Sequence, residues 1–249
     1  MLRNIIISYI TFYVVAGTDL VFRSTKVYTI IEDESLESLA RGLRGKKTSK
    51  VFTDPEGEER DLVSAVEELE YDEREGIIRG HLRMDTAKIY TDRDGEQSVG
   101  YGLSDAPFFI VEGSTRLMVR AKKVTANTTA NTLSRLLWGR TGHILEKFFE
   151  TNHIQAFLSR NPHTPEKIMW AGLTLPGTNS ATLEGSDVSE SPDYAHYDTL
   201  GGSKRFVRVR LNDRNISLSL SDEGIVTFYS PLDDGQIEAF LIEKVCPVL

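Results

Sequence analysis

Cysteine is almost absent from this sequence, since Cys246 is the only one among 249 residues. A single cysteine excludes an intramolecular disulfide and a metal cluster held by several thiolates of one chain. Both exclusions are typical of a protein that works in a reducing compartment. We therefore expect a cytoplasmic location.

The sequence also lacks the motifs that carry familiar chemistry. It contains no G-x-S-x-G elbow, no P-loop and no G-x-G-x-x-G following a predicted strand. His143, His153 and His163 recur at intervals of ten, which matches no helix face and no ligand spacing. We expect no cofactor and no metal ion, and we favour a non-catalytic role.

Long apolar runs are missing as well. The most apolar stretch, residues 5–16, is too short to span a bilayer. It follows Arg3 and so loosely resembles a secretory signal, but serine, threonine and tyrosine residues interrupt it. Its β-branched and aromatic residues favour a strand over residues 4–16, and we expect no membrane association.

Charge is distributed unevenly along the chain. The net charge is −8, yet residues 115–147 carry seven basic side chains against one acid, a local balance of +6 that leaves −14 for the rest. Residues 54–75 hold eleven acids against two arginines and have apolar residues spaced as in an amphipathic helix. The basic segment is therefore the candidate anion-binding surface.

Within the basic segment we predict a strand over 116–124. Alternation along a strand places Arg116, Arg120 and Lys122 on one face. A helix predicted to begin near Asn127 or Thr128 would add free N–H groups and a partial positive charge, which together favour phosphate binding. Two other interpretations remain open: an ordinary solvated sheet face, and pairing with the acidic segment 54–75.

A second strand rich in arginine is predicted over 205–211. Two of its arginines alternate with Phe206, and an aromatic ring beside arginines on an open sheet can hold single-stranded nucleic acid. No RNP-type sequence accompanies it. The predicted nucleic-acid-binding residues of both segments are Arg116, Arg120, Lys122, Lys123, Asn127, Thr128, Arg135, Arg205, Arg208 and Arg210.

The alternation of predicted elements indicates an α+β fold, with mixed, largely antiparallel sheets and helices packed on one face. A proline-containing stretch near residue 160 divides the chain into two associated lobes, 1–160 and 161–249, although one continuous domain remains possible. Predicted helices cover 33–43, 54–75, 127–138, 144–158 and a C-terminal stretch opened by Ser230 and Pro231; residues 46–50 and 176–203 are predicted loops.

These features favour a non-catalytic accessory subunit that binds nucleic acid or phosphate. The first alternative is a protein–protein adaptor that docks through the acidic helix 54–75. The second is a metal-dependent hydrolase or nuclease built on the polar loop 176–203, whose oxygen and nitrogen donors are Asp187, Asp193, His196 and Asp198.

Overall fold

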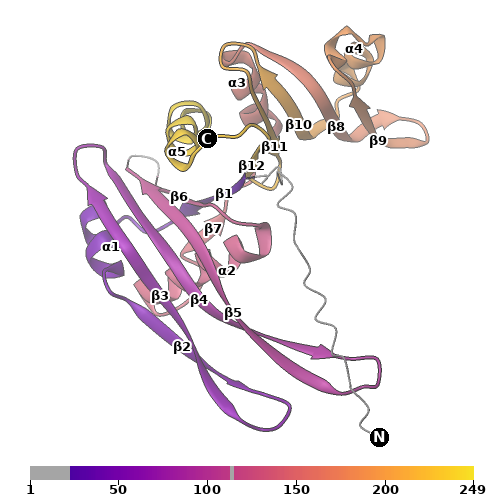
Figure 1. Cartoon of the computed structure of the whole chain (residues 1–249). Coiled ribbons are helices and arrows are strands. Elements are labelled where there is room, and N and C mark those ends of the chain that lie inside the picture. The colour runs from indigo at the N-terminus through magenta and orange to yellow at the C-terminus, as the bar shows by residue number, and fades with distance from the viewer. Residues whose placement is uncertain (1–22, 113–114) are drawn as a thin grey trace, which may run out of the picture.

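A single antiparallel sheet organises the molecule (Figure 1). The computed structural model describes residues 23–112 and 115–249, and the strand expected over residues 4–16 lies outside them. The strand order of the sheet is β2-β3-β4-β5-β6-β1-β12-β11-β10-β8-β9, and β7 also pairs with β1. The strands are β1 (Arg23–Ile30), β2 (Lys47–Thr53), β3 (Glu59–Asp72), β4 (Ile77–Thr91), β5 (Gln97–Val111), β6 (Arg116–Val119), β7 (Ile144–Glu146), β8 (His163–Leu175), β9 (Thr178–Glu184), β10 (Ser203–Leu211), β11 (Ile216–Ser221) and β12 (Ile225–Phe228).

Five α-helices accompany the strands in the described part of the chain, so the α+β, largely antiparallel prediction is confirmed. Helix α1 begins at Leu36, three residues after the predicted start at residue 33, because the side chain of Ser35 accepts a hydrogen bond from the Ser38 N–H and caps it. None of these helices is long and apolar enough to cross a membrane. The helices are α1 (Leu36–Leu43), α2 (Lys123–Trp138), α3 (Thr151–Arg160), α4 (Pro192–Thr199) and α5 (Asp234–Phe240).

Two hydrophobic clusters are built on the sheet, and strand β1 contributes to both. Tyr28 packs in the cluster that contains α1 and α2, whereas its neighbour Val27 packs in the cluster that contains α3 and α5. Because successive residues of a strand point to opposite faces, helices contact the central strands from both sides. We had expected helices on one face of the sheet only, and helices on both faces were not predicted.

Two long hairpins, β2–β3 and β4–β5, extend well beyond the helices (Figure 1). Strands β4 and β5 pair continuously from Ile77↔Val111 to Thr91↔Gln97. The pairing of β3 with β4 is shorter and ends at Ser64↔Met84. The outer halves of these hairpins therefore form a sheet surface that no helix of the described chain covers completely.

The acidic segment 54–75 was predicted to be a helix, and this prediction is wrong because most of it is strand β3. A register shift between Glu67 and Glu70 marks a β-bulge, at which Glu68 has a φ of 51°. The bulge changes which face later residues take, so Val66 and Leu69 pack on the same cluster. Their spacing along the sequence then imitates a helical period.

Four other local predictions are corrected. Residues 46–50 contribute to β2 rather than to a loop, and residues 144–158 contain β7 and the first part of α3 rather than one helix. Residues 176–203 contain β9 and α4 instead of an irregular loop. The last helix begins at Asp234, not at Pro231, because the Asp233 side chain accepts the Gln236 N–H at 2.8 Å and caps it there.

Candidate nucleic-acid interface

The basic strand expected over 116–124 does not form as one exposed face. Strand β6 ends at Val119, and the first of its predicted ligands, Arg116, turns inward. Its guanidinium donates hydrogen bonds to the Thr29 hydroxyl and to the Leu249 carbonyl oxygen. Burial lowers the pKa of Arg116 below its ordinary value.

The next cations of this segment have acidic partners. Arg120 lies 2.9 Å from a carboxylate oxygen of Asp234, and Lys123 Nζ lies 2.7 Å from Glu223 Oε1. The hydrogen bond to Glu223 raises the pKa of Lys123. Both charges are thus compensated within the molecule. The prediction that they present a free positive surface with Arg116 is wrong.

Helix α2 also begins earlier than expected. Lys122 occupies the N-cap position, and the helix starts at Lys123 instead of near residue 127. Asn127 therefore lies in the second turn, where it accepts the Tyr28 hydroxyl at 2.6 Å. Thr128 donates its hydroxyl to the Val124 carbonyl oxygen at 3.0 Å. Neither side chain lies at the helix N-terminus, where the predicted phosphate site had placed them.

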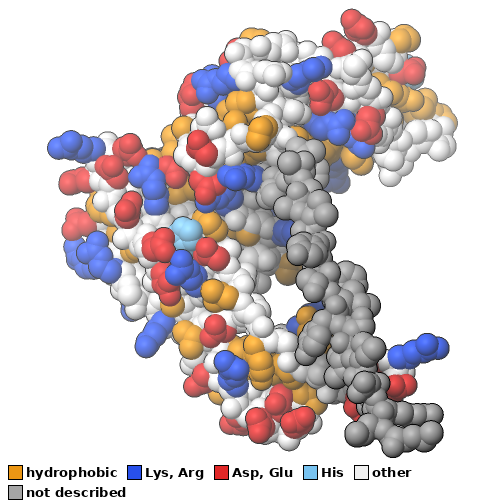
Figure 2. All heavy atoms as spheres, viewed as in Figure 1, with side chains coloured by type: hydrophobic (Ala, Val, Ile, Leu, Met, Phe, Trp, Pro, Cys, Tyr) orange, Lys and Arg blue, Asp and Glu red, His pale blue; other side chains and the backbone are white. Residues whose placement is uncertain are grey.

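The arginines of β10 are likewise paired. Arg205 forms an ion pair with Asp222, and Arg208 and Arg210 share the carboxylate of Glu166. Figure 2 shows the same pattern more widely, because acidic and basic side chains intermingle on the face in view. The second predicted arginine surface is therefore a set of ion pairs across neighbouring strands.

A groove of about 610 Å³ lies elsewhere, between helix α2 and the outer part of strands β2–β5. A row of directly paired residues crosses the four strands here, Thr48↔Ser64↔Met84↔Ser104. Eight lining residues carry hydroxyl groups, and we call this surface the hydroxyl groove. These eight are Thr48, Ser49, Ser64, Thr86, Ser104, Thr125, Thr128 and Thr132.

Two cations line the hydroxyl groove without acidic partners. The side chain of Lys50 makes no hydrogen bond or ion pair with any residue that the structure describes. Arg135 has one long contact, 3.5 Å to the Thr132 hydroxyl in its own helix. The single carboxylate of the lining, Asp85, accepts the backbone N–H of Val63 at 3.0 Å. The groove therefore combines hydroxyl donors with a net positive charge.

Three of the ten predicted ligands are close to this groove. Thr128 and Arg135 line it, and Lys122 precedes the helix that forms one of its walls. Reasoning from the sequence missed Lys50 and the hydroxyl groups of β2–β5. Their signal was present, because Thr48 and Lys50 alternate in a segment that was interpreted as a basic loop.

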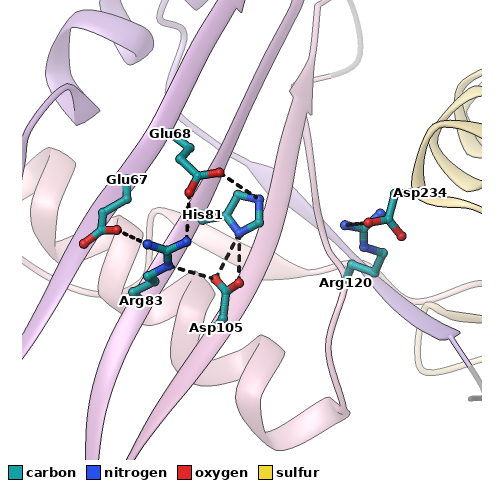
Figure 3. Close-up of polar contacts among 7 residues, drawn as sticks. All are labelled: Glu67, Glu68, His81, Arg83, Asp105, Arg120 and Asp234. Carbon is teal, nitrogen blue, oxygen red and sulfur yellow. Dashed lines mark hydrogen bonds and ion pairs between the residues drawn. The ribbon is translucent and has the colours of Figure 1, made fainter.

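The opposite face of the sheet carries a compact charge network (Figure 3). Arg83 Nη2 lies 2.8 Å from Glu68 Oε1, and the same guanidinium also pairs with Glu67. His81 Nδ1 lies 3.0 Å from Asp105 Oδ1. A histidine beside a carboxylate resembles part of a catalytic triad, but no serine, threonine or cysteine of the described chain is hydrogen-bonded to His81. The network pairs two acids of β3, Glu67 and Glu68, with side chains of β4.

The region proposed for metal binding has a different role. Asp198 lies on α4, where its carboxylate pairs with the nearly buried Lys204 and accepts the Trp170 N–H at 3.4 Å. His196, on the same helix, contacts the ring of Tyr197. Among the described residues there is no group of three or more His, Cys, Asp or Glu side chains that could hold a metal ion.

Comparison of the chain with protein-family models and with curated protein sequences found no match.

Proposed function

We propose that this protein is a non-catalytic accessory subunit that binds nucleic acid or phosphate groups in the hydroxyl groove. The observation that carries the proposal is the pair of unpaired cations, Lys50 and Arg135, among eight hydroxyl-bearing residues. Hydroxyl groups and basic side chains are the usual partners of phosphate oxygens. The remaining predicted cations mostly have acidic partners and do not compete for this role.

The overall charge of −8 supports a localised site. A negatively charged protein repels polyanions, so binding depends on a surface where positive charge is free. Lys47 and Lys122, which flank groove residues in the sequence, add two exposed side chains without an ion pair among the described residues. We infer that phosphate contacts from this region provide most of the affinity and make it sensitive to salt.

The test is a pair of charge-reversal variants measured by fluorescence polarisation with labelled single-stranded DNA, duplex DNA and RNA. The double variant Lys50→Glu, Arg135→Glu should lose at least about tenfold in affinity, and its log–log salt slope should be shallower by roughly 1.4 to 1.8. The control, Arg205→Glu with Arg210→Glu, changes the net charge equally at the other predicted surface. Equal losses in both variants, or no binding by the wild type, would contradict the proposal.

The adaptor function is a second candidate, on a different surface. The face of the β4–β5 hairpin opposite the hydroxyl groove exposes Ile89, Tyr101 and Leu103, the last with 65% of its surface accessible. Exposed apolar side chains that gather on one face favour protein contacts. An interaction that survives nuclease treatment and is lost on Leu103→Asp would favour the adaptor over the nucleic-acid-binding subunit.

We also propose that the chain forms two associated lobes divided near residue 160, which share the hydrophobic cluster that contains α3 and α5. The hydroxyl groove belongs to the N-terminal lobe, since all of its lining residues precede residue 136. The C-terminal lobe, with β8–β12, would then remain available for a partner. Separate surfaces for a ligand and for a partner support an accessory role.

A further inference from the structure

The sheet face that forms the hydroxyl groove continues along β4 to an exposed tyrosine. Thr86 lines the groove, and Lys88 and Tyr90 follow it on the same face because side chains alternate along a strand. Tyr90 lies four residue steps along the strand from Thr86, which corresponds to about 13 Å. A ligand lying in the groove would reach Tyr90 by following the strand.

The neighbouring strand makes room for this ring. Gly100 and Gly102 pair with Lys88 and Thr86, so β5 presents bare backbone on this face at two successive positions. A β-carbon at position 100 would lie 2.7 Å from Cε2 of Tyr90. The tyrosine ring therefore occupies the space that a side chain at Gly100 would take, and it lies against the backbone of the sheet.

The ring is also accessible and close to a cation. Tyr90 keeps 51% of its surface exposed, and Lys88 Nζ lies 5.1 Å from the ring centroid. Nucleic-acid bases stack on aromatic rings of this kind, while nearby basic side chains bind the phosphates between them. Lys88, Lys50 and Arg135 thus place positive charge along the whole path.

We infer that the hydroxyl groove binds single-stranded nucleic acid, with one unpaired base stacked on Tyr90 and the backbone held by Lys50, Lys88 and Arg135. This inference rests on the proposed function and narrows its ligand. A duplex keeps its base faces stacked on one another, so an exposed ring adds affinity only for an unpaired strand.

Three labelled probes separate stacking from charge: an oligothymidine, an abasic oligonucleotide with the same number of phosphates, and a duplex of the same length. The variants are Tyr90→Ala, which removes the ring, and Tyr90→Phe, which keeps it. Tyr101→Ala is the matched control, because Tyr101 is similarly exposed at 44% and its alternation places it on the opposite face of the same hairpin.

The wild type should bind oligothymidine at least about fivefold more tightly than the abasic strand, and Tyr90→Ala should abolish that difference. Tyr90→Phe and Tyr101→Ala should preserve it. Equal affinity for all three probes, with sensitivity to Lys50→Glu and Arg135→Glu retained, would overturn the single-strand inference and leave the proposed function intact. No binding of any probe would overturn both.

Discussion

Lys26 shows how a single charged residue can serve the fold instead of a ligand. Its side chain is fully buried and forms an ion pair with Glu146. The other carboxylate oxygen of Glu146 accepts the Asn127 amide at 3.0 Å, and Asn127 in turn accepts the Tyr28 hydroxyl. This series of hydrogen bonds connects β1, β7 and α2. Asn127, a predicted nucleic-acid ligand, is therefore a structural residue.

Replacing Lys26 with methionine should destabilise the protein by roughly 2 kcal/mol, because Glu146 would lose its partner while remaining partly buried. The loss should be below that of a fully buried pair, since 38% of the Glu146 side chain is exposed. Urea denaturation measures the change. The control is Lys123→Met, which breaks the exposed pair with Glu223 and should leave the urea midpoint almost unchanged. Equal losses in the two variants would refute this account.

At the scale of single residues, the sequence predicted where charge is but not which charges are free. Lys123 and Glu223 are 100 residues apart, and Arg23 and Asp234 are 211 apart. Such pairs depend on the tertiary arrangement, which alternation along one strand does not reveal. Arg135 and Thr128, predicted as nucleic-acid ligands, line the site now proposed.

The first turn of helix α3 contains a histidine whose ring accepts a backbone hydrogen bond. The backbone N–H of Glu150 donates a hydrogen bond to His153 Nδ1 at 3.1 Å, which requires that nitrogen to be unprotonated. Burial lowers the pKa of His153, and the nearby Lys147 lowers it further. The folded protein consequently binds this proton less readily than the unfolded chain.

Acidification should therefore weaken α3. The depressed pKa contributes stability above the ordinary histidine pKa of about 6.5, and that stability is lost as the pH falls through the lower folded-state pKa. His153→Gln keeps a hydrogen-bond acceptor that does not titrate, so its melting temperature should fall less between about pH 7.5 and about pH 5.5. His196→Gln, on the exposed face of α4, should behave like the wild type. Parallel pH profiles for all three proteins would contradict this prediction.

Elements with a regular pattern were predicted well, and those with an interruption were not. Helix α1 has a cap and an apolar stripe, and both are visible in the sequence. Strand β3 was misassigned because its bulge changes the face of Leu69. Residues 144–158 were misassigned because Ile144 and Phe157 are buried in different clusters, so their spacing reflects two elements rather than one.

On the scale of the whole molecule, strand β1 joins the two clusters. It pairs with β6 on one side and with β12 on the other. Helix α5, from the last part of the chain, packs in one cluster with Ile77, Phe109 and Met118 from the first part. The two proposed lobes therefore cannot separate at β1 without breaking the pairing of β1 with β6 or with β12.

We predict that the two lobes unfold in one transition. The chain has two tryptophans, Trp138 packed against one cluster and Trp170 buried in the other. In the variants Trp138→Phe and Trp170→Phe, the remaining tryptophan reports on one cluster alone. Within each variant, fluorescence and circular dichroism should show the same urea midpoint. Midpoints that differ between the two probes would indicate lobes that unfold independently.

The sheet order could not be predicted from the sequence. Alternation and turn residues identify strands, but they do not show that β1 inserts between β6 and β12. The β4–β5 hairpin joins strands that are adjacent in the sequence, but its full length was not predicted either. Predicting the hydroxyl groove would have required both the local hairpins and the packing of a later helix, since the groove combines two hairpins with helix α2.

The place of β1 also has a consequence for protein synthesis. The side chains of Ser24 and Thr227 meet across the β1–β12 pair, although 203 residues separate them in the chain. During translation, β1 emerges early, and its edge at Arg23–Lys26 keeps no partner until β12 has followed it. Pairing over such a separation is slow, and open strand edges promote aggregation. We therefore expect the part of β1 that pairs with β12 to be prone to aggregation until β12 has been synthesised.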